Sequence, residues 1–211
     1  MKLYYAKVLN PRKVCAVAKY LNSPVDYVYV NLAKGGTSAP DFLCINPNGK
    51  VPVLTDGDLT LWEADAIICH LARKAGSNLW PADDAHKIEI VRWSSWNANH
   101  FTRATGALYF EYVVKPMFRI GDADPAEVEP AMQQFHKFAG VLDDHLKPRD
   151  YLVGDALSAA DFAVAVSLPY AEQMKLPLGQ YPNIARWHDR LNELPAWRDP
   201  FPAAPAKAAC P

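Results

Sequence analysis

The sequence predicts a fold of two unlike units, an α/β unit followed by an all-helical one. Segments rich in β-branched and aromatic residues alternate with helical patterns only in the first third of the chain. Beyond a polar, proline-containing stretch, apolar residues recur at helical spacing and no strand pattern remains. We therefore expect a first domain at 1–77, a linker at 78–84 and a helical domain at 85–211.

The elements of the first domain are bounded by turn and capping residues. Asn10 followed by Pro11 predicts a helix N-cap with proline at the first helical position. Asp56-Gly57 predicts a two-residue hairpin turn. The expected elements are strands at 2–5 and 26–30, helices at 11–21, near 40–45 and at 63–75, and hairpin strands at 52–55 and 58–62.

In the second domain, capping signals mark where helices begin. Asp124-Pro125 combines an N-cap with a proline at the first helical position, and Ser158 with Asp161 forms a capping box. We interpret Asp161 as a folding residue rather than a catalytic one, because its position serves the cap. The expected helices run over 85–117, from 125 to 146, from 158 onward and over 182–194, and the tail from Pro195 to Pro211 is expected to be extended.

Charge and composition exclude several classes of function. The net charge is −1, from 22 basic and 23 acidic residues mixed along the chain, so no basic block marks a nucleic-acid surface. No apolar run is long enough to span a membrane, and the N-terminus runs into a strand pattern without a signal peptide. We expect a cytoplasmic protein that binds neither nucleic acid nor membrane.

Cysteine and histidine usage predicts reduced thiols and no metal site. The four cysteines are scattered along the chain, and the six histidines lack the spacing of metal ligands. Cys15 lies inside the first predicted helix without a partner cysteine, so a buried structural thiol is favoured over a redox nucleophile. Cys44 and Cys69 lie on apolar helix faces and are expected in the core.

Val51-Pro52 and Glu63 are the most informative positions. A strand that begins with Val-Pro is unusual, because proline cannot donate a hydrogen bond to a sheet, and it is tolerated where a cis bond turns the chain. The residue before the proline then offers its backbone N–H and C=O to an extended ligand. Glu63 opens a helix whose N-terminus attracts anions. The sequence thus predicts a binding site for a peptide backbone beside a binding site for a charged group.

Motifs along nearly the whole chain are similar to those of one family. They lie at 2–5 (Lys-Leu-Tyr-Tyr), 46–54, 61–67, 79–83, 99–101, 114–116 and 150–155, the last leading into the capping box at 158–161. On these motifs the chain resembles the cytosolic glutathione transferases, and bacterial theta-, beta- or nu-like members in particular. The resemblance implies a thioredoxin-like N-terminal domain with a C-terminal helical bundle, a homodimer, and glutathione as co-substrate.

The resemblance also implies where glutathione would bind. Val51 would hold the cysteinyl backbone beside a cis Pro52, and Lys50 would lie near the glycyl end. Thr37 stands where relatives often place a residue for the glycyl carboxylate.

The γ-glutamyl end would lie at Glu63 and Ala64. The family usually has Glu-Ser here, so Ala64 lacks one hydroxyl, a loss of about 0.5–1.5 kcal/mol for a neutral hydrogen bond. Asp65 would compensate by reaching the glutathione ammonium.

The sequence leaves the activation of the thiol open. A free thiol titrates near about 8.5, so a thiolate at neutral pH needs roughly 2.7 kcal/mol of differential stabilisation. A helix N-terminus contributes about 0.3–1 kcal/mol, up to about 2 when partly buried. Relatives add a serine or tyrosine hydroxyl in the loop before the first helix, but the loop at 6–12 has no serine, threonine or cysteine. Asn10 aligns with an asparagine of nu-like relatives and Val8 with their hydroxyl residue, so Asn10 is either a donor to the sulfur or only an N-cap.

Three polar and aromatic residues mark a possible second half of the site. Trp96, His100 and Arg103 share one helix face, at spacings of four and three. If that face lines the seam between the domains, they frame the electrophile site, with Tyr109 or Phe110 as an apolar wall. The alternative is that Trp96 is core and that His100 and Arg103 form a polar cluster.

Together these inferences predict a glutathione transferase that activates the glutathione thiol for attack on a small hydrophobic electrophile, as in detoxification. Two alternatives stay open from the sequence. One is a glutathione-dependent peroxidase or disulfide reductase of the same fold. The other is a non-catalytic glutathione transferase-like module that binds partners, which the absent loop hydroxyl and Ala64 favour.

Overall fold

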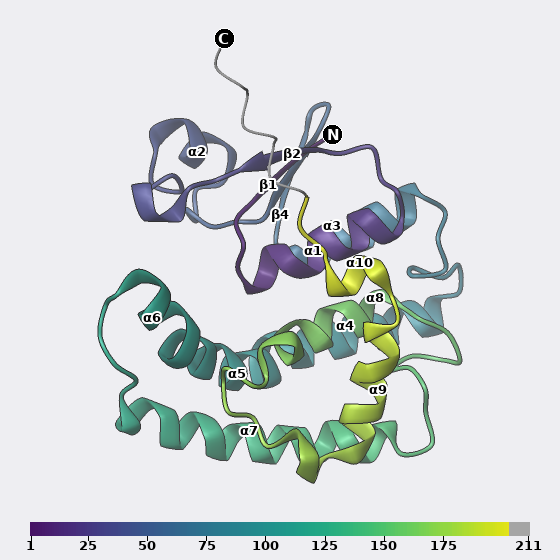
Figure 1. Cartoon of the computed structure of the whole chain (residues 1–211). Helices are drawn as coiled ribbons and strands as arrows, with labels where there is room; N and C mark the ends of the chain where they lie inside the picture. Colours follow the sequence, from purple (N-terminus) through teal and green to yellow (C-terminus); the bar gives the residue numbers. More distant parts are fainter. Residues whose placement is uncertain (203–211) are drawn as a thin grey trace.

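The computed structural model confirms the expected fold class, because a four-stranded sheet with flanking helices is followed by helices alone (Figure 1). It describes residues 1–202. The sheet and its helices lie at one end of the molecule and the helical bundle at the other (Figure 1).

The sheet is built around β1. Its strands are β1 (Lys2–Tyr5), β2 (Asp26–Tyr29), β3 (Val53–Asp56) and β4 (Leu59–Trp62), in the order β2-β1-β3-β4. β1 runs parallel to β2 and antiparallel to β3. Leu3 pairs with Tyr27 on one side and Leu54 on the other, and its side chain is fully buried.

The hairpin turn lies one residue later than the sequence predicted. Asp56 pairs with Leu59, so the two turn residues are Gly57 and Asp58 rather than Asp56 and Gly57. Gly57 has φ +61°, a conformation that glycine adopts without the clash of a Cβ atom.

Three α-helices and one 3₁₀ turn accompany the sheet: α1 (Leu9–Tyr20), η1 (Leu32–Lys34), α2 (Pro40–Ile45) and α3 (Ala64–Lys74). α1 packs along α3, and both lie between the sheet and the helical bundle (Figure 1). α2 lies away from the bundle. The N-termini of α1 and α3 are therefore held on the side of the sheet that faces the second domain.

The predicted cap of α1 is wrong. The helix begins at Leu9 and its N-cap is Val8, which makes no side-chain cap hydrogen bond. Asn10 is the second residue of the helix and is exposed. Because the first helical amides need no intrahelical partner, Pro11 is tolerated at the third position and does not fix where the helix starts.

The predicted helix at 85–117 is a continuous run of helical turns with two irregular segments. It consists of α4 (Asp84–Trp96), the π turn η2 (Asn97–Phe101), α5 (Thr102–Tyr109), the π turn η3 (Phe110–Val114) and α6 (Lys115–Phe118). Inside η2, the buried Asn97 donates to the carbonyl oxygen of Ala163 at 3.0 Å and accepts from Thr102 at 2.8 Å. A side chain thus supplies hydrogen bonds where the regular ladder is interrupted.

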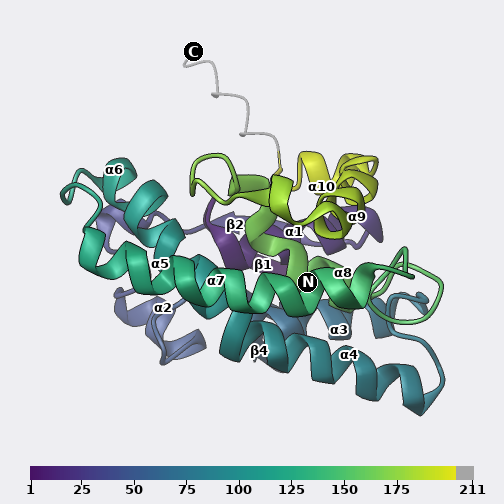
Figure 2. The same cartoon turned by 90° about the horizontal axis from the view of Figure 1, so that it is seen from below.

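The remaining helices are α7 (Pro125–Leu146), α8 (Ala159–Val164), the 3₁₀ turns η4 (Ala165–Tyr170) and η5 (Leu178–Gln180), α9 (Pro182–Asn192) and α10 (Pro195–Arg198). α7 runs along the side of the bundle opposite the sheet (Figure 1) and crosses the front of the view from below (Figure 2). α10 replaces the extended tail that the sequence predicted from Pro195. The rest of the predicted tail, with Cys210, lies beyond the described residues after Pro202.

One hydrophobic core passes through both parts of the molecule. It joins Ile67 and Ile68 of α3 to Phe162 of α8 and Trp197 of α10, all of them fully buried. In residues 1–202 no helix is both long and apolar enough to cross a membrane. The division into domains at 1–77 and 85–211 stays a prediction, and this continuous core joins the two parts.

Asp161 holds the centre of the bundle together. Its side chain has no exposed surface and accepts hydrogen bonds from the backbone N–H groups of Leu152 and Ser158, at 2.9 and 2.8 Å. The Ser158 hydroxyl and the Trp187 indole N–H complete the set, at 2.8 and 2.9 Å. The carboxylate therefore joins a loop, the start of α8 and the middle of α9, as a capping box extended by two further donors.

Replacing Asp161 with alanine is expected to lower the free energy of unfolding by at least about 3 kcal/mol, because several buried donors lose their acceptor together. Urea unfolding followed by far-ultraviolet circular dichroism measures the loss. Asp144→Ala, which removes an exposed ion pair with Lys147, is the matched control and should change stability by less than about 0.5 kcal/mol. Equal effects of the two substitutions would contradict the central role of Asp161.

Candidate active site

The peptide bond between Val51 and Pro52 is cis, as the sequence predicted. Both residues precede β3, and β1 pairs with β3 only from Val53 onward. Within residues 1–202 the backbone N–H and C=O of Val51 make no hydrogen bond to other backbone groups. Val51 thus offers a donor and an acceptor at an unpaired position beside the sheet.

Asn46 shapes the loop that leads to Val51. Its side chain is buried, with 2% of its surface exposed. The amide Nδ2 donates to the carbonyl oxygen of Lys50 at 2.7 Å, and Oδ1 accepts from the backbone N–H of Asn48 at 3.0 Å. The amide thereby fixes the chain directly before the cis bond while the Lys50 side chain extends into solvent.

Thr37 lies on the other side of this loop. A Cβ atom on Gly49, which has φ +60°, would approach the carbonyl oxygen of Thr37 to 3.3 Å. The structure therefore brings Thr37 close to the segment that carries Lys50, although the two are distant in sequence. Both are available at the same end of the extended Val51 backbone.

Glu63 caps α3 in a strained conformation. It has φ +71° and ψ 114°, a region that costs a non-glycine residue about 1–3 kcal/mol, and its side chain is exposed. No side chain caps the helix, and the first amides, from Ala64 to Ala66, have no intrahelical acceptor. Strain combined with free amides is typical of a site for a carboxylate.

Asp65 does not point freely at a ligand, because it forms an ion pair with Lys13 of α1. Lys13 has 3% of its surface exposed, whereas Asp65 is half-buried. The pair links the N-terminal part of α1 to the first turn of α3. The sequence had assigned Asp65 to the ligand alone and gave no sign of its partner, since 52 residues separate the two.

The N-terminus of α1 lacks a hydroxyl donor. Its cap is Val8, and Pro11 removes one of the first four amides, which leaves those of Leu9 and Asn10 free. The exposed Asn10 side chain makes no hydrogen bond within the described residues, so it is free to donate to a ligand.

Of the cysteines near this region, Cys15 is part of the core, as predicted. It is fully buried in α1, and burial raises the pKa of its thiol to about 12. A thiol with such a pKa carries almost no thiolate at neutral pH, which excludes it as a nucleophile there. The prediction for Cys44 is wrong: its side chain is exposed at the end of α2, because only Phe42 of that short helix is buried.

Trp96, His100 and Arg103 do share one helix face, but that face does not meet the first domain. The ring of His100 stacks on Phe138 of α7, with centroids 4.9 Å apart, and Trp96 meets the edge of the same ring at 6.1 Å. Arg103 and His100 line a cavity of about 690 Å³ between α5 and α7. The expectation that this face lines the seam between the domains is therefore wrong.

The opposite face of the same helix runs beside Glu63. A groove of about 470 Å³ between α3 and α4 is lined by Glu63, Asp65, Ala66, Cys69, Trp80, Ile90, Val91, Ser94, Ser95, Ala98 and Asn99. Ser94, Ser95 and Asn99 were not predicted as site residues from the sequence. Helical spacing places them near one another on the helix, but it does not show that their face packs against α3.

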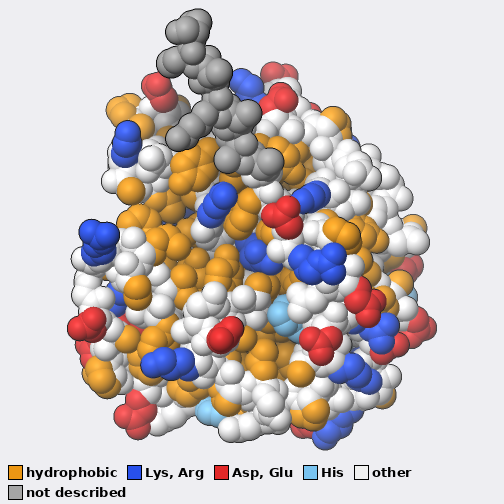
Figure 3. All heavy atoms as spheres, in the orientation of Figure 1, with side chains coloured by type: hydrophobic (Ala, Val, Ile, Leu, Met, Phe, Trp, Pro, Cys, Tyr) orange, Lys and Arg blue, Asp and Glu red, His pale blue; other side chains and the backbone are white. Residues whose placement is uncertain are grey.

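Two aromatic residues of neighbouring helical turns, Tyr109 and Phe110, differ in their exposure. Tyr109 of α5 is buried and packs against Tyr170 of η4, with ring centroids 4.9 Å apart. Phe110, the next residue, is 44% exposed. Figure 3 shows hydrophobic side chains gathered along the seam between the sheet end and the helical end of the molecule. This seam is an apolar surface near the start of α1.

The site contains no evident metal position: among the described residues, no three His, Cys, Asp or Glu side chains are grouped so as to hold a metal ion.

Comparison with known proteins places the chain in a family. Two family models match it: "Glutathione S-transferase, N-terminal domain" over residues 1–73 and "Glutathione S-transferase, C-terminal domain" over residues 106–195. Glutathione S-transferase 3 of Zea mays is 33% identical over 221 residues, which cover 97% of this chain and 97% of that relative. The chain belongs to the glutathione S-transferase family.

Other members of the glutathione S-transferase family agree over nearly the same length. The transferase GstB of Escherichia coli K12 is 29% identical over 192 residues, covering 90% of this chain and 91% of its own. A solved structure of glutathione S-transferase-I bound with lactoylglutathione has a TM-score of 0.85 and 28% identity, covering 94% of this chain and 97% of its own. The structure of glutathione S-transferase I from maize with an atrazine glutathione conjugate gives the same TM-score at 29% identity, covering 94% and 95%.

Removing the carboxylate of Asp65 is expected to destabilise the fold by about 3–5 kcal/mol, because the ammonium of Lys13 is then buried without a partner. Asp65→Asn tests this by urea unfolding. Asp84→Asn is the matched control, since Asp84 forms an exposed pair with Lys87. The double variant Lys13→Met/Asp65→Leu should recover most of the loss; no recovery would mean that the charge pair itself is not the cause.

Proposed function

We propose that the protein is a glutathione transferase that binds glutathione extended between the Val51 backbone and the N-terminus of α3. The observation that carries this proposal is the unpaired backbone of Val51 beside the cis Pro52, together with free amides under the strained Glu63. Unpaired backbone groups suit the cysteinyl part of a peptide. The helix N-terminus suits the γ-glutamyl carboxylate, with the backbone N–H of Ala64 as one donor.

The remaining glutathione contacts are proposed from position. Lys50 supplies a cation toward the glycyl carboxylate, and Thr37, beside Gly49, approaches the same end. Asp65 shares its carboxylate between Lys13 and the ammonium of the γ-glutamyl group, since one carboxylate has several acceptor positions.

The sulfur would face the start of α1, with Asn10 as a side-chain donor. This role is the one that resembles nu-like relatives, and we propose it in place of a cap function, which Asn10 does not have. A small hydrophobic electrophile would approach along the seam, where Phe110 offers an exposed ring and Tyr109 a buried wall. The theta-, beta- or nu-like subclass remains part of this proposal.

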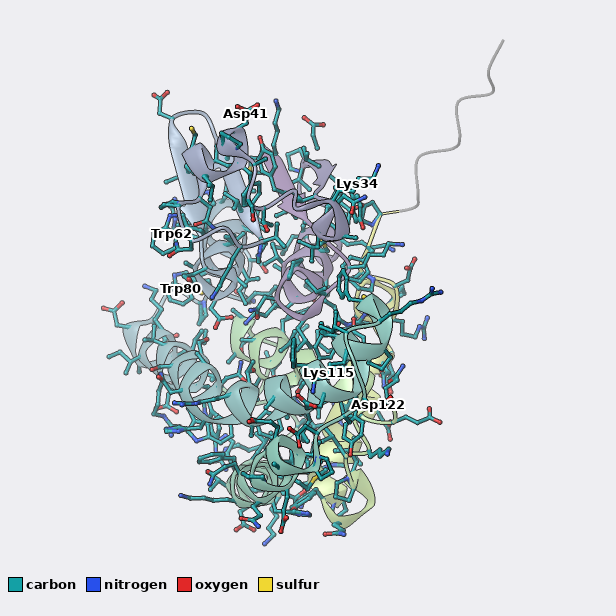
Figure 4. The ribbon with its side chains drawn as sticks, turned by 90° about the vertical axis from the view of Figure 1, so that its left-hand side faces the viewer. Lys34, Asp41, Trp62, Trp80, Lys115 and Asp122 are labelled. Carbon is teal, nitrogen blue, oxygen red and sulfur yellow. The ribbon has the colours of Figure 1, made fainter. Side chains whose placement is uncertain are left out.

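We also propose that the protein is a cytoplasmic homodimer. Val91, which lines the groove between α3 and α4, is 56% exposed; Ile88, one turn earlier on α4, is 66% exposed, and Trp62, directly before Glu63, is 42% exposed. Trp62 and Trp80 lie close together on this side of the molecule (Figure 4). A second copy is the occupant that a family of dimers suggests, and gel filtration with light scattering would detect it.

Glutathione should bind at millimolar concentration or below and show thiolate absorbance in the ultraviolet at neutral pH. The helix N-terminus stabilises the charged form of the sulfur. Titration of the protein with glutathione, recorded as difference absorbance, measures both quantities. S-methylglutathione, which has no ionisable thiol, is the matched control ligand. Binding without a thiolate signal would leave only a non-catalytic glutathione-binding module.

Reduction of peroxides or disulfides through bound glutathione is the second candidate, favoured by the absence of a hydroxyl at Val8 and the exposed Asn10 amide. The two activities share the thiolate but differ in the atom it attacks. Parallel assays with an aryl halide and with an organic hydroperoxide, each with glutathione, decide between them.

Asn10→Ala is expected to lower turnover at least about tenfold while stability changes by less than about 0.5 kcal/mol, because the side chain caps nothing in the structure. Val8→Ser should raise both quantities. It adds a helix cap, which raises stability by about 0.5–2 kcal/mol, and a hydroxyl beside the sulfur, which raises turnover. Val8→Ala controls for the lost side chain. Steady-state kinetics and thermal unfolding are measured together, and unchanged turnover in Asn10→Ala would remove Asn10 from the mechanism.

A further inference from the structure

Arg12 is a buried cation at the start of α1. It is the fourth residue of the helix and only 8% of its surface is exposed. Its guanidinium donates from Nη2 to the carbonyl oxygen of Trp197 at 2.6 Å. The guanidinium carbon lies 5.4 Å from the centroid of the Trp197 ring and 5.7 Å from that of Tyr170. The side chain is thus held in the seam by α10 and η4.

No carboxylate compensates this charge within residues 1–202, where Arg12 forms no ion pair and its Nε has no hydrogen-bond partner. The ionisable or charged groups around it are Tyr109, Tyr170, Glu172, His188, Arg198 and Asp199. The two acids among them, Glu172 and Asp199, are exposed, and neither forms an ion pair with Arg12; Asp199 pairs with Lys19.

His188 neither compensates the charge of Arg12 nor adds a second positive charge beside it. Burial lowers its pKa to about 4, so the imidazole is neutral at neutral pH. Lys13, the next residue along the chain, is neutralised by Asp65, and Lys7 in the preceding loop is exposed to solvent. Arg12 is therefore the buried, unneutralised positive charge closest to the start of α1.

Burying such a charge is costly. A guanidinium removed from water without a carboxylate destabilises the fold, whereas a methionine or leucine would fill the same space without that cost. Burial also lowers the pKa of Arg12, although an arginine stays protonated at neutral pH. A cost of this kind is retained at sites where the charge has a use.

The position of Arg12 beside the N-terminus of α1 indicates what its charge does. At 1.5 Å of rise per residue, the Cα of Arg12 lies about 4.5 Å along the helix axis from that of Leu9. Helical side chains lean toward the N-terminus of their helix. This end of α1 has two free amides and no hydroxyl, because Val8 is its cap and Pro11 carries no N–H.

We propose that Arg12 supplies the positive charge that stabilises the glutathione thiolate at the N-terminus of α1, in place of the hydroxyl donor that the chain lacks. The inference rests on the proposed function, since it names how that site ionises its thiol. A buried cation acts through protein rather than water, so its field on the sulfur is screened little by salt. No contact between Arg12 and the sulfur is required.

The test is the pKa of the thiol of bound glutathione, measured by ultraviolet absorbance across a pH series. Arg12→Gln should raise this pKa by about one unit, which is a tenfold smaller thiolate-to-thiol ratio at neutral pH. Arg12→Lys keeps the charge and should stay close to the unmodified protein. Arg198→Gln, which removes an exposed cation from the same neighbourhood, is the matched control and should leave the pKa unchanged.

A salt series on the unmodified protein tests the same idea without a variant. The pKa of the bound thiol should be nearly independent of ionic strength, whereas a field from the exposed Lys7 would weaken as salt is added.

The inference is overturned if folded Arg12→Gln binds glutathione with an unchanged thiol pKa, a result that would make Arg12 an anchor for α10 only. If that variant does not fold, a thiol pKa that rises steeply with salt in the unmodified protein overturns it equally. Failure of the proposed function looks different: the unmodified protein would then bind no glutathione, or bind it without any thiolate at neutral pH.

Discussion

The ion pair between Lys13 and Asp65 sets the geometry on which the candidate site depends. It joins the fifth residue of α1 to the second residue of α3, and the two helices pack side by side between the sheet and the bundle. A buried pair of this kind adds little net stability, because desolvation offsets attraction, but it penalises any arrangement that separates its partners. Both helix N-termini are therefore held near the end of the sheet at which Val51 and Pro52 lead into β3.

In the proposed site, backbone groups would bind the glutathione peptide and side chains would activate its thiol. The groups available to the peptide are mostly backbone: the unpaired Val51 and the amides that begin α3. Such groups are insensitive to substitution, so the proposed γ-glutamyl contact would need only the backbone N–H of Ala64 and no serine hydroxyl. The start of α1 is different, because Val8 carries no hydroxyl that could donate to a bound sulfur. Under the proposed function, Asn10 and the buried Arg12 would supply the donor and the charge instead.

Local chemistry made much of the fold predictable. The strand at 2–5, the hairpin, the box of Ser158 with Asp161 and the proline that opens α7 all follow from a few adjacent residues. Errors arose where one residue type serves two purposes. Asn10 before Pro11 has the composition of a cap, yet the helix starts at Leu9, two residues earlier than this cap predicts. The tail from Pro195 has the composition of an extended segment, yet the buried Ala196 and Trp197 draw its first turn into a helix against α1.

The fold class, the cis bond at Val51-Pro52 and the acidic residue that opens α3 can be predicted from the sequence alone, since each depends on contiguous residues. Which helix faces meet depends on how whole elements pack. Trp96 and His100 have the spacing of a site, but they face Phe138 of α7, because helical periodicity groups residues without naming the partner. The partners of Asp65 and Arg12 are likewise distant in sequence, at Lys13 and Trp197. Contacts of this kind arise from packing of whole elements, and no local pattern encodes them.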